Sequence, residues 1–372
     1  MRIAVDARGI NWYKGTGIGT YTYNVLKNLL SIDLENNYSI FWSGPISKEF
    51  TYDKTEVIMA SRRHQRFFEN IYFPNYLYDK KVDLYHIPQN GIGLNDQVNC
   101  KKVVTIHDLI PYVMPETVGK GYLKKFLNDM PKIMENCDGI LTVSVYSKKD
   151  ILKFFPSIDE SKIFVTPLAA DTSFMPLNKA QCRKITNDRF NFNTEFLLYI
   201  GGFSTRKNVL GIIQAFNKLR KDTNLSLVIV GSLRDEGMKL VDICKELNLE
   251  DRVIFTGFVE DSFLPILYNG CQVFIYPSLY EGFGLPPLEA MSCNTPVITS
   301  EVTSIPEVVL DTALLINPLS SQELYEAMGK LISSKEARDS LALKGYERSK
   351  LFNWQKTSEA TLKAYTSVLS QV

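Results

Sequence analysis

Residues 276–291 read YPSLYEGFGLPPLEAM, and this stretch decides how the second half of the chain folds. The apolar run that ends at Tyr276 predicts a buried strand, and the glycine-rich segment after it predicts a loop. Pro286 or Pro287 then starts a helix. In parallel α/β sheets, ligands bind where strands end and helices begin, which is where Glu281 lies.

The same alternation of short β-rich runs and longer amphipathic segments continues on both sides of this stretch. It predicts an α/β protein with doubly wound parallel sheets. The predicted strands of the first half are Arg2–Asp6, Tyr38–Trp42, Val57–Met59, Leu84–Ile87, Val103–Ile106, Gly139–Val143 and Lys162–Val165. Those of the second half are Phe196–Ile200, Leu225–Val230, Val253–Phe255, Val273–Tyr276 and Val297–Thr299.

The length of 372 residues suits two domains of ordinary size. The alternation lapses between Asp171 and Thr194, and this polar, turn-rich stretch is interpreted as a linker. We therefore expect one domain over residues 1–185 and a second over 186–354. The segment from about 355 to 372 predicts a final amphipathic helix.

Composition excludes several classes of protein. A net charge of +1 gives no reason to expect nucleic-acid binding. Six scattered cysteines indicate a reducing compartment, and no apolar run is long enough to cross a bilayer. Because Asp6 also interrupts the N-terminal apolar run, no signal peptide is predicted. We therefore expect a cytoplasmic protein, with any membrane contact peripheral and at the inner face of the cell membrane.

Charge is distributed unevenly between the halves. Residues 1–185 carry 24 Lys and Arg against 19 Asp and Glu, whereas residues 186–372 carry 18 against 22. A basic first half suits an anionic partner, such as a lipid surface or a lipid diphosphate, although chance also explains so small an excess. Basic and aromatic residues are interleaved between Arg62 and Tyr78. That run predicts either contact with a membrane or lipid-linked acceptor, or a helix with its aromatic side chains packed inward.

Two further segments have the form of anion-binding turns between a strand and a helix. In the first, residues 15–20 (GTGIGT), glycines including Gly17 and Gly19 open a helix and let backbone amides approach an anion. The spacing is neither that of a dinucleotide fingerprint nor that of a P-loop. In the second, residues 201–208 (GGFSTRKN), Arg206 and Lys207 lie at a helix start, where the helix dipole disfavours cations. A bound diphosphate would explain these cations, and a solvated basic turn is the alternative.

The decisive stretch supplies two carboxylates eight residues apart, Glu281 and Glu289, each able to accept hydrogen bonds from sugar hydroxyls. This segment resembles the Glu-x₇-Glu signature of glycosyltransferase family 4, and the resemblance covers essentially the whole chain. Supporting stretches are GTGIGTYTYNVL, VTIHDLIP, LTVSVYSKKDI, TPLAAD, YIGGFSTRKN, VIFTGFV and PVITSEVTSIPEV. The first of these together with the RKN turn most resembles bacterial mannosyltransferases that build surface polysaccharides.

The resemblance implies a GT-B fold, in which two Rossmann-like domains face each other across a cleft. It implies that the last helix crosses back to the first domain and that the second domain binds most of a nucleotide-sugar. Lys207 matches the family's phosphate-binding lysine. Because Gly202 stands where an arginine is common, Arg206 is expected to supply the second charge.

Further roles follow from the resemblance. Glu281 is expected to hold donor-sugar hydroxyls, and Glu289 the ribose hydroxyls. His107, which follows a predicted strand, is expected to contact the donor sugar. Backbone amides that face the diphosphate and sugar are expected from Gly282, Phe283, Gly284 and Leu285. His64 and His86 are expected to be structural.

The resemblance implies a retaining glycosyltransferase that moves a hexose to a glycan or a lipid-linked glycan. By the same resemblance GDP-mannose is the favoured donor, with UDP- and dTDP-sugars as alternatives. No cofactor is expected, and no metal, because the sequence holds no Asp-x-Asp pair. The rival interpretations are a sugar phosphorylase or epimerase of the same architecture, and a non-catalytic nucleotide-sugar-binding scaffold. A pyridoxal-lysine region, which a phosphorylase of the glycogen type needs, is not apparent in the sequence.

Overall fold

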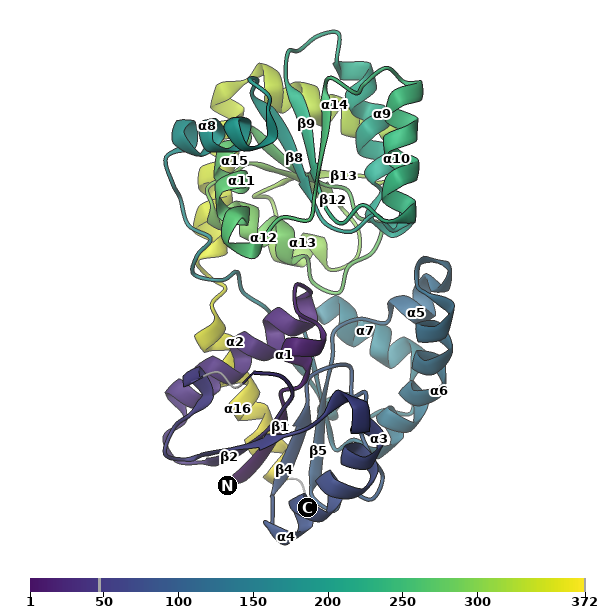
Figure 1. Cartoon of the computed structure of the whole chain (residues 1–372), viewed down its shortest axis with the longest axis vertical. Helices are drawn as coiled ribbons and strands as arrows, with labels where there is room; N and C mark the ends of the chain where they lie inside the picture. The colour runs from purple at the N-terminus through teal and green to yellow at the C-terminus, as the bar shows by residue number, and fades with distance from the viewer. Residues whose placement is uncertain (46–47, 371–372) are drawn as a thin grey trace. The chain divides into compact units, whose positions relative to one another are not determined.

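The computed structural model describes residues 1–45 and 48–370 (Figure 1). The chain forms two compact units. The first contains Met1–Leu168 together with the end of the chain from Asn353, and the second contains Ala169–Phe352. The units therefore divide after Leu168, whereas the sequence pattern placed the boundary after residue 185.

The polar stretch between Asp171 and Thr194 is not a linker throughout, because helix α8 (Lys179–Phe190) lies within it. Asn178 caps the start of α8, and Asn191 ends it in a left-handed conformation. The helix packs on α11 (Leu264–Gly270), where the Arg183 side chain donates to the Gly270 carbonyl oxygen. Its largely polar sequence explains why apolar periodicity did not reveal it.

The first unit is built on a seven-stranded parallel sheet in the order β3-β2-β1-β4-β5-β6-β7. Strand order reverses beside β1, which pairs with β2 on one side and β4 on the other. The strands are β1 (Arg2–Asp6), β2 (Asn37–Trp42), β3 (Thr55–Met59), β4 (Leu84–Ile87), β5 (Lys101–Ile106), β6 (Gly139–Thr142) and β7 (Ile163–Val165). Each overlaps a strand predicted from sequence.

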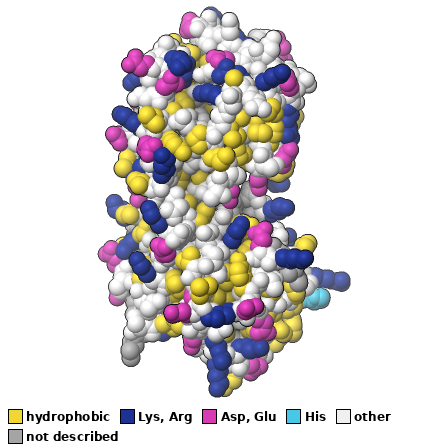
Figure 2. Space-filling model, turned by 90° about the vertical axis from the view of Figure 1, so that its left-hand side faces the viewer, with side chains coloured by type: hydrophobic (Ala, Val, Ile, Leu, Met, Phe, Trp, Pro, Cys, Tyr) yellow, Lys and Arg dark blue, Asp and Glu magenta, His cyan; other side chains and the backbone are white. Residues whose placement is uncertain are grey.

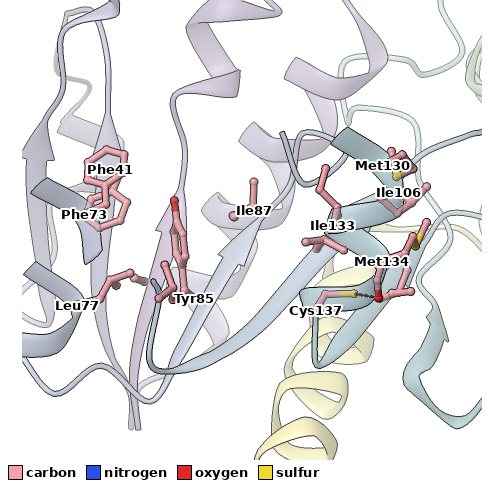
Figure 3. Packing of buried hydrophobic residues seen from close by; sticks show 14 of the residues in the cluster. Phe41, Phe73, Leu77, Tyr85, Ile87, Ile106, Met130, Ile133, Met134 and Cys137 are labelled. Carbon is pink, nitrogen blue, oxygen red and sulfur yellow. Dashed lines mark hydrogen bonds between the residues drawn. The ribbon is translucent and has the colours of Figure 1, made fainter. Parts of the chain in front are cut away.

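Helices cover both faces of this sheet (Figure 1). They are α1 (Gly9–Trp12), α2 (Gly17–Ile32), α3 (Gln65–Phe67), α4 (Phe73–Asp79), α5 (Ile110–Val113), α6 (Lys120–Asn136), α7 (Val145–Phe154) and α16 (Trp354–Ser370). A π-helical turn, Phe68–Tyr72, joins α3 to α4. In the core, the rings of Phe41 and Phe73 stack at 3.9 Å, and Ile106 packs in the same cluster as Met130 of α6 (Figure 3).

The last helix, α16, belongs to the first unit. Its Thr357 hydroxyl donates to the Pro167 carbonyl oxygen at 2.6 Å, and its Tyr365 hydroxyl lies 2.6 Å from Nδ1 of His86. Both His86 and Tyr365 are fully buried, so His86 has a structural role, as expected. Residues 371 and 372, the last two of the predicted terminal helix, lie outside the described residues.

The second unit repeats the plan with six parallel strands in the order β10-β9-β8-β11-β12-β13. They are β8 (Phe196–Ile200), β9 (Ser226–Val230), β10 (Val253–Gly257), β11 (Val273–Tyr276), β12 (Val297–Ser300) and β13 (Leu314–Ile316), the last of which the sequence pattern missed. The remaining helices are α9 (Val209–Leu219), α10 (Asp235–Glu246), α12 (Leu285–Ser292), α13 (Ile305–Val309), α14 (Ser321–Ser333) and α15 (Lys335–Ser349). Strand order reverses between β8 and β11, which is the usual ligand-binding point of such sheets.

Candidate active site

Two loops meet at this reversal of strand order in the second unit. One follows β8 and contains a 3₁₀ turn, Thr205–Lys207, while the other follows β11 and contains Glu281. The Leu279 amide donates to the Arg206 carbonyl oxygen at 2.8 Å, which ties the loops together. The fold therefore brings Glu281 together with Arg206 and Lys207, which precede it by 75 and 74 positions in the sequence.

Glu281 is the centre of this cluster. Its Oε1 atom accepts hydrogen bonds from Lys207 Nζ at 2.6 Å and from Arg206 Nη1 at 2.8 Å. It also accepts from the Tyr276 hydroxyl at 3.0 Å and the Ser278 hydroxyl at 2.5 Å. The Glu281 side chain is only 13% exposed, so these contacts form largely out of water.

The charges in the cluster determine the ionisation of Glu281. Burial alone would raise the pKa of this carboxyl, but the neighbouring Lys207 and Arg206 outweigh it and lower the pKa to about 2. Glu281 is therefore a carboxylate at neutral pH. Two cations and one carboxylate thus meet in one partly buried cluster, an arrangement that suits an anionic ligand.

Local backbone geometry holds the two cations in place. Asn208, directly after Lys207, adopts a left-handed conformation with φ of 53° and starts α9. Asparagine tolerates this conformation better than most residues, and its side chain also donates to the Pro318 carbonyl oxygen at 2.6 Å. Arg206 donates a second hydrogen bond to the Tyr280 carbonyl oxygen. The RKN turn thus presents both cations toward the Glu281 loop.

The second carboxylate of the signature, Glu289, has a different environment. It lies in α12, and its Oε2 atom accepts a hydrogen bond from the Tyr268 hydroxyl at 2.8 Å. Burial raises the pKa of this carboxyl to about 7, against which the Tyr268 hydrogen bond acts only in part. Glu289 therefore titrates near neutral pH, whereas Glu281 does not.

The segment between the two carboxylates forms the start of α12. The Ser304 hydroxyl contacts the carbonyl oxygens of Glu281 at 2.8 Å and Phe283 at 3.0 Å. Gly284 has φ of 109°, and a Cβ atom there would lie 2.5 Å from Ile305 Cδ1. Only glycine suits this position, and the helix then begins at Leu285. Ser304 thus fixes the carbonyl groups of Glu281 and Phe283. The expectation that the amides of Gly282, Phe283, Gly284 and Leu285 face a ligand stays a prediction.

In the first unit, His107 follows β5 and is buried. Its Nε2 atom lies 2.8 Å from the Pro88 carbonyl oxygen, and because a carbonyl only accepts, Nε2 carries the hydrogen. Burial lowers the pKa of His107 to about 4, so the ring is neutral at physiological pH. A neutral ring with hydrogen on Nε2 leaves Nδ1 as an acceptor, which suits a sugar hydroxyl.

The glycine turn predicted in the first unit begins α2. The Thr16 hydroxyl caps this helix by accepting from the Gly19 amide at 3.4 Å. A Cβ atom on Gly19 would lie 2.4 Å from the Tyr13 carbonyl oxygen, whereas one on Gly17 would meet nothing within 4 Å. Gly19 therefore has a packing role, which the sequence analysis did not anticipate. The anion-binding role expected of Gly17 and Gly19 stays a prediction.

Sequence reasoning missed several members of the site. Tyr276 and Ser278 lie inside the stretch quoted at the outset, but the strand pattern accounted for Tyr276 as an apolar residue. Tyr268, the partner of Glu289, comes from α11 and has no sequence signal linking it to that carboxylate. In related sequences, hydroxyl-bearing residues on otherwise apolar strands and helices are the candidates for such partners of the two carboxylates.

Within residues 1–45 and 48–370, no group of three or more His, Cys, Asp or Glu side chains is arranged to hold a metal ion. Among the same described residues, no helix has the length and apolar character needed to cross a membrane.

Comparison with known proteins identifies the family. The model of the family described as glycosyl transferases group 1 matches residues 184–348. O-antigen chain mannosyltransferase B of Escherichia coli is 32% identical over 291 residues, covering 78% of this chain and 75% of that protein. The serotype-specific mannosyltransferase WbdA of Escherichia coli is 28% identical over 280 residues, but this chain spans only 34% of its length.

Structural comparison agrees on the fold. Sucrose-phosphate synthase from Thermosynechococcus elongatus superposes with a TM-score of 0.79 at 22% identity, and the match covers all of both chains. At that identity the likeness speaks for the GT-B type of fold alone, with its two parallel-sheet α/β domains. The family model and the sequence relatives show that this chain belongs to the group 1 glycosyltransferases, the family of the Glu-x₇-Glu signature.

Proposed function

We propose that this glycosyltransferase transfers mannose from GDP-mannose, with retention, to a glycan or lipid-linked glycan in surface-polysaccharide synthesis. Support comes from the relatives, since both mannosyltransferases named above have names that refer to O-antigen or serotype. UDP- and dTDP-sugars are the alternative donors within the same reaction class.

The observation that carries the proposal is the pairing of Arg206 and Lys207 with the carboxylate of Glu281. In the proposed reaction the two cations stabilise the negative charge that develops on the departing diphosphate. Glu281 orients them and accepts hydrogen bonds from the donor sugar. Its low pKa suits this role, because a carboxylate that stays ionised is an acceptor only.

Retention is proposed to follow from attack on the same face of the sugar as the leaving group, with a donor phosphate oxygen taking the acceptor's proton. The alternative route to retention uses a protein carboxylate as nucleophile. Glu281 is poorly suited to that role, since four donors converge on its Oε1 atom. Hydrogen bonds to a carboxylate reduce its nucleophilic character by stabilising the charge that it would have to give up.

We also propose that transfer needs no divalent metal, since Arg206, Lys207 and the amides at the start of α12 supply the positive potential. Activity measured with and without a chelator tests this directly. Turnover that disappears with chelator and returns with added Mg²⁺ or Mn²⁺ would contradict it.

A nucleotide screen tests the donor. GDP, UDP, dTDP and ADP are compared by thermal shift, because a ligand at a hundred times its Kd stabilises a protein by about 2.7 kcal/mol. GDP is expected to raise Tm most, and GDP-mannose to be consumed slowly even without acceptor. A larger shift with UDP or dTDP would identify another donor, and no donor consumption with any sugar nucleotide would indicate a scaffold.

The first unit is proposed to hold the acceptor and to contact the inner face of the membrane through the segment from Arg62 to Tyr78. The structure places Phe73 and Leu77 of this run in the core. Others are exposed, with Phe67 at 48%, Ile71 at 52% and Tyr78 at 69%. Arg62, Arg63 and Arg66 are exposed in the same run. Exposed arginines close in sequence to exposed apolar side chains suit an anionic lipid surface. Figure 2 shows hydrophobic, basic and acidic side chains intermingled on the face of the molecule that it draws.

A further inference from the structure

A hollow of about 380 Å³ lies in the second unit, at the amino ends of β8, β9 and β11. Asn193 and Thr194 line it just before β8, Thr223 and Asn224 just before β9, and Gln272 immediately before β11. Glu281 and Lys207 follow the carboxyl ends of the same sheet. The hollow is therefore at the opposite edge from the proposed donor site, and its volume is in the range of small-molecule sites.

Gln272 is the most informative residue of the hollow. It is only 6% exposed, and its backbone amide donates to the Phe196 carbonyl oxygen at 2.8 Å. Its side-chain amide makes no hydrogen bond to any described residue, and its polar atoms are open to the hollow rather than sealed from solvent. Whatever fills the hollow, solvent or a ligand, therefore supplies the hydrogen-bond partners of this amide.

Two more amides and two hydroxyls face the same space. Asn193 and Asn224 lie at its rim, and among the described residues their side chains make no hydrogen bond. The Thr194 hydroxyl is 2.6 Å from that of Ser226, and the Thr223 hydroxyl oxygen accepts from the Leu225 amide at 3.2 Å. Amides and hydroxyls both donate and accept, as sugar hydroxyls do, which makes them suitable partners for a polyol.

The charged residues around the hollow already have partners. Glu195 pairs with Arg183, while Arg338 donates to the carbonyl oxygens of Leu331 at 2.6 Å and Ile332 at 2.8 Å. One acid and one base, each engaged, leave no excess positive charge for a phosphate. None of the described residues that line the hollow is aromatic, so a nucleobase would find no ring on which to stack.

We propose that this hollow is a second carbohydrate site, which binds a hexose unit of a neutral glycan through the amides of Gln272, Asn193 and Asn224. The inference rests on the proposed function, because an enzyme that extends a mannose-containing chain has such a glycan at hand. Held at this edge of the sheet, a product chain would stay near the enzyme between rounds of transfer, which raises its effective concentration at the active site.

The test is calorimetric titration of the full chain, saturated with GDP, with α-linked mannotriose as the probe. Binding is expected, and Asn193→Ala/Asn224→Ala is expected to weaken it about tenfold by removing two amide–hydroxyl contacts. Both side chains are exposed, so this double variant keeps the fold. Gln272→Leu, which removes the buried amide at similar volume, is expected to abolish binding. Gln322→Ala, an exposed amide of α14 that does not line the hollow, is the matched control.

Activity separates this proposal from the proposed function. The double variant should transfer to a short soluble acceptor with unchanged kcat/KM, but give shorter products on a long one. Glu281→Gln should lose transfer while still binding mannotriose. Binding unaffected by all three hollow substitutions, or absent while transfer persists, would overturn the carbohydrate site and leave the proposed function standing. Tighter binding of inorganic phosphate than of mannotriose would overturn its assignment to a neutral ligand.

Discussion

Lys207 Nζ and Glu281 Oε1 lie 2.6 Å apart, in an ion pair whose members come from loops after different strands. The pair links Lys207, the proposed phosphate-binding residue, to Glu281, the proposed sugar-binding residue. A donor that engages Lys207 through its diphosphate also competes with Glu281 for that cation, and Arg206 remains beside the carboxylate. Under the proposed function, the energy of donor binding and the orientation of the donor sugar are therefore coupled through these two residues.

Replacing Lys207 with alanine should lower kcat/KM by about 2–4 kcal/mol of transition-state stabilisation, as the loss of a preorganised charged group typically does. Lys330→Ala, an exposed lysine of α14, serves as the control. Steady-state rates with GDP-mannose and acceptor provide the measurement. Near-normal kcat/KM for Lys207→Ala would mean that the cation does not serve the leaving group.

Glu281 should contribute to stability at acid pH in a defined direction. Its pKa is lowered from 4.5 to about 2 in the folded protein, so its contribution is present above pH 4.5 and is lost as pH falls through about 2. Glu281→Gln should therefore flatten this part of the profile of unfolding free energy against pH. Chemical denaturation across that window measures it, and identical slopes for the two proteins would contradict the ion-pair arrangement.

The contribution of Glu289 to folding stability should change with pH in the opposite direction. Its pKa is raised from 4.5 to about 7, so its stabilising contribution is complete below pH 4.5 and is lost as pH rises through about 7. The wild-type protein without ligand should lose Tm across this range relative to Glu289→Gln, whose amide does not titrate. Thermal unfolding of both proteins at matched pH tests this. A Tm difference that is the same at every pH would show that burial does not hold Glu289 protonated.

The start of α2 offers a matched pair of glycine substitutions. Gly19→Ala should destabilise the protein by about 1–3 kcal/mol, because its Cβ atom would lie 2.4 Å from a backbone oxygen. Gly17→Ala should cost little, since the space there is open. Denaturant unfolding compares the two. Equal stability would mean that the turn before α2 shifts freely to make room.

Membrane binding should depend on the exposed arginines of the first unit. Removing Arg62, Arg63 and Arg66 together should reduce binding to vesicles that contain anionic lipid, at about 1 kcal/mol for each charge. Sedimentation with anionic and zwitterionic vesicles measures the effect. A triple variant of Lys239, Lys245 and Lys335, exposed in the second unit, is the control. Binding that ignores lipid charge, or falls equally in the control, would end the proposal.

The sequence was sufficient for the parallel strands because buried strands of such sheets are continuous apolar runs, as at Phe196–Ile200. It was insufficient for α8, because that helix packs on α11 although its sequence is largely polar and carries almost no apolar stripe. It was also insufficient for β13, which is only three residues long. Both elements depend on contacts that no local pattern contains.

Some residues of the candidate site could likewise be predicted from the sequence, and others could not. Charged groups with an unusual position, such as Lys207 at a helix start, were visible because they conflict with local electrostatics. Tyr276 and Tyr268 were not, because a tyrosine in an apolar run looks like any core aromatic until its hydroxyl finds a carboxylate. The structure brings Glu281 together with both cations, and the catalytic roles of these residues remain predictions.

The membership of α16 in the first unit has a consequence for biosynthesis. Tyr365 and Val368 are fully buried there, and Gly139 of β6 leaves room for the Val368 side chain, since a Cβ atom would lie 2.5 Å from it. A ribosome delivers the chain from its N-terminus, so residues 1–168 emerge long before the helix that completes their core. The second unit, uninterrupted in sequence, is free to fold first. A released chain truncated before Trp354 should therefore carry a protease-resistant second unit joined to a first unit that is still susceptible.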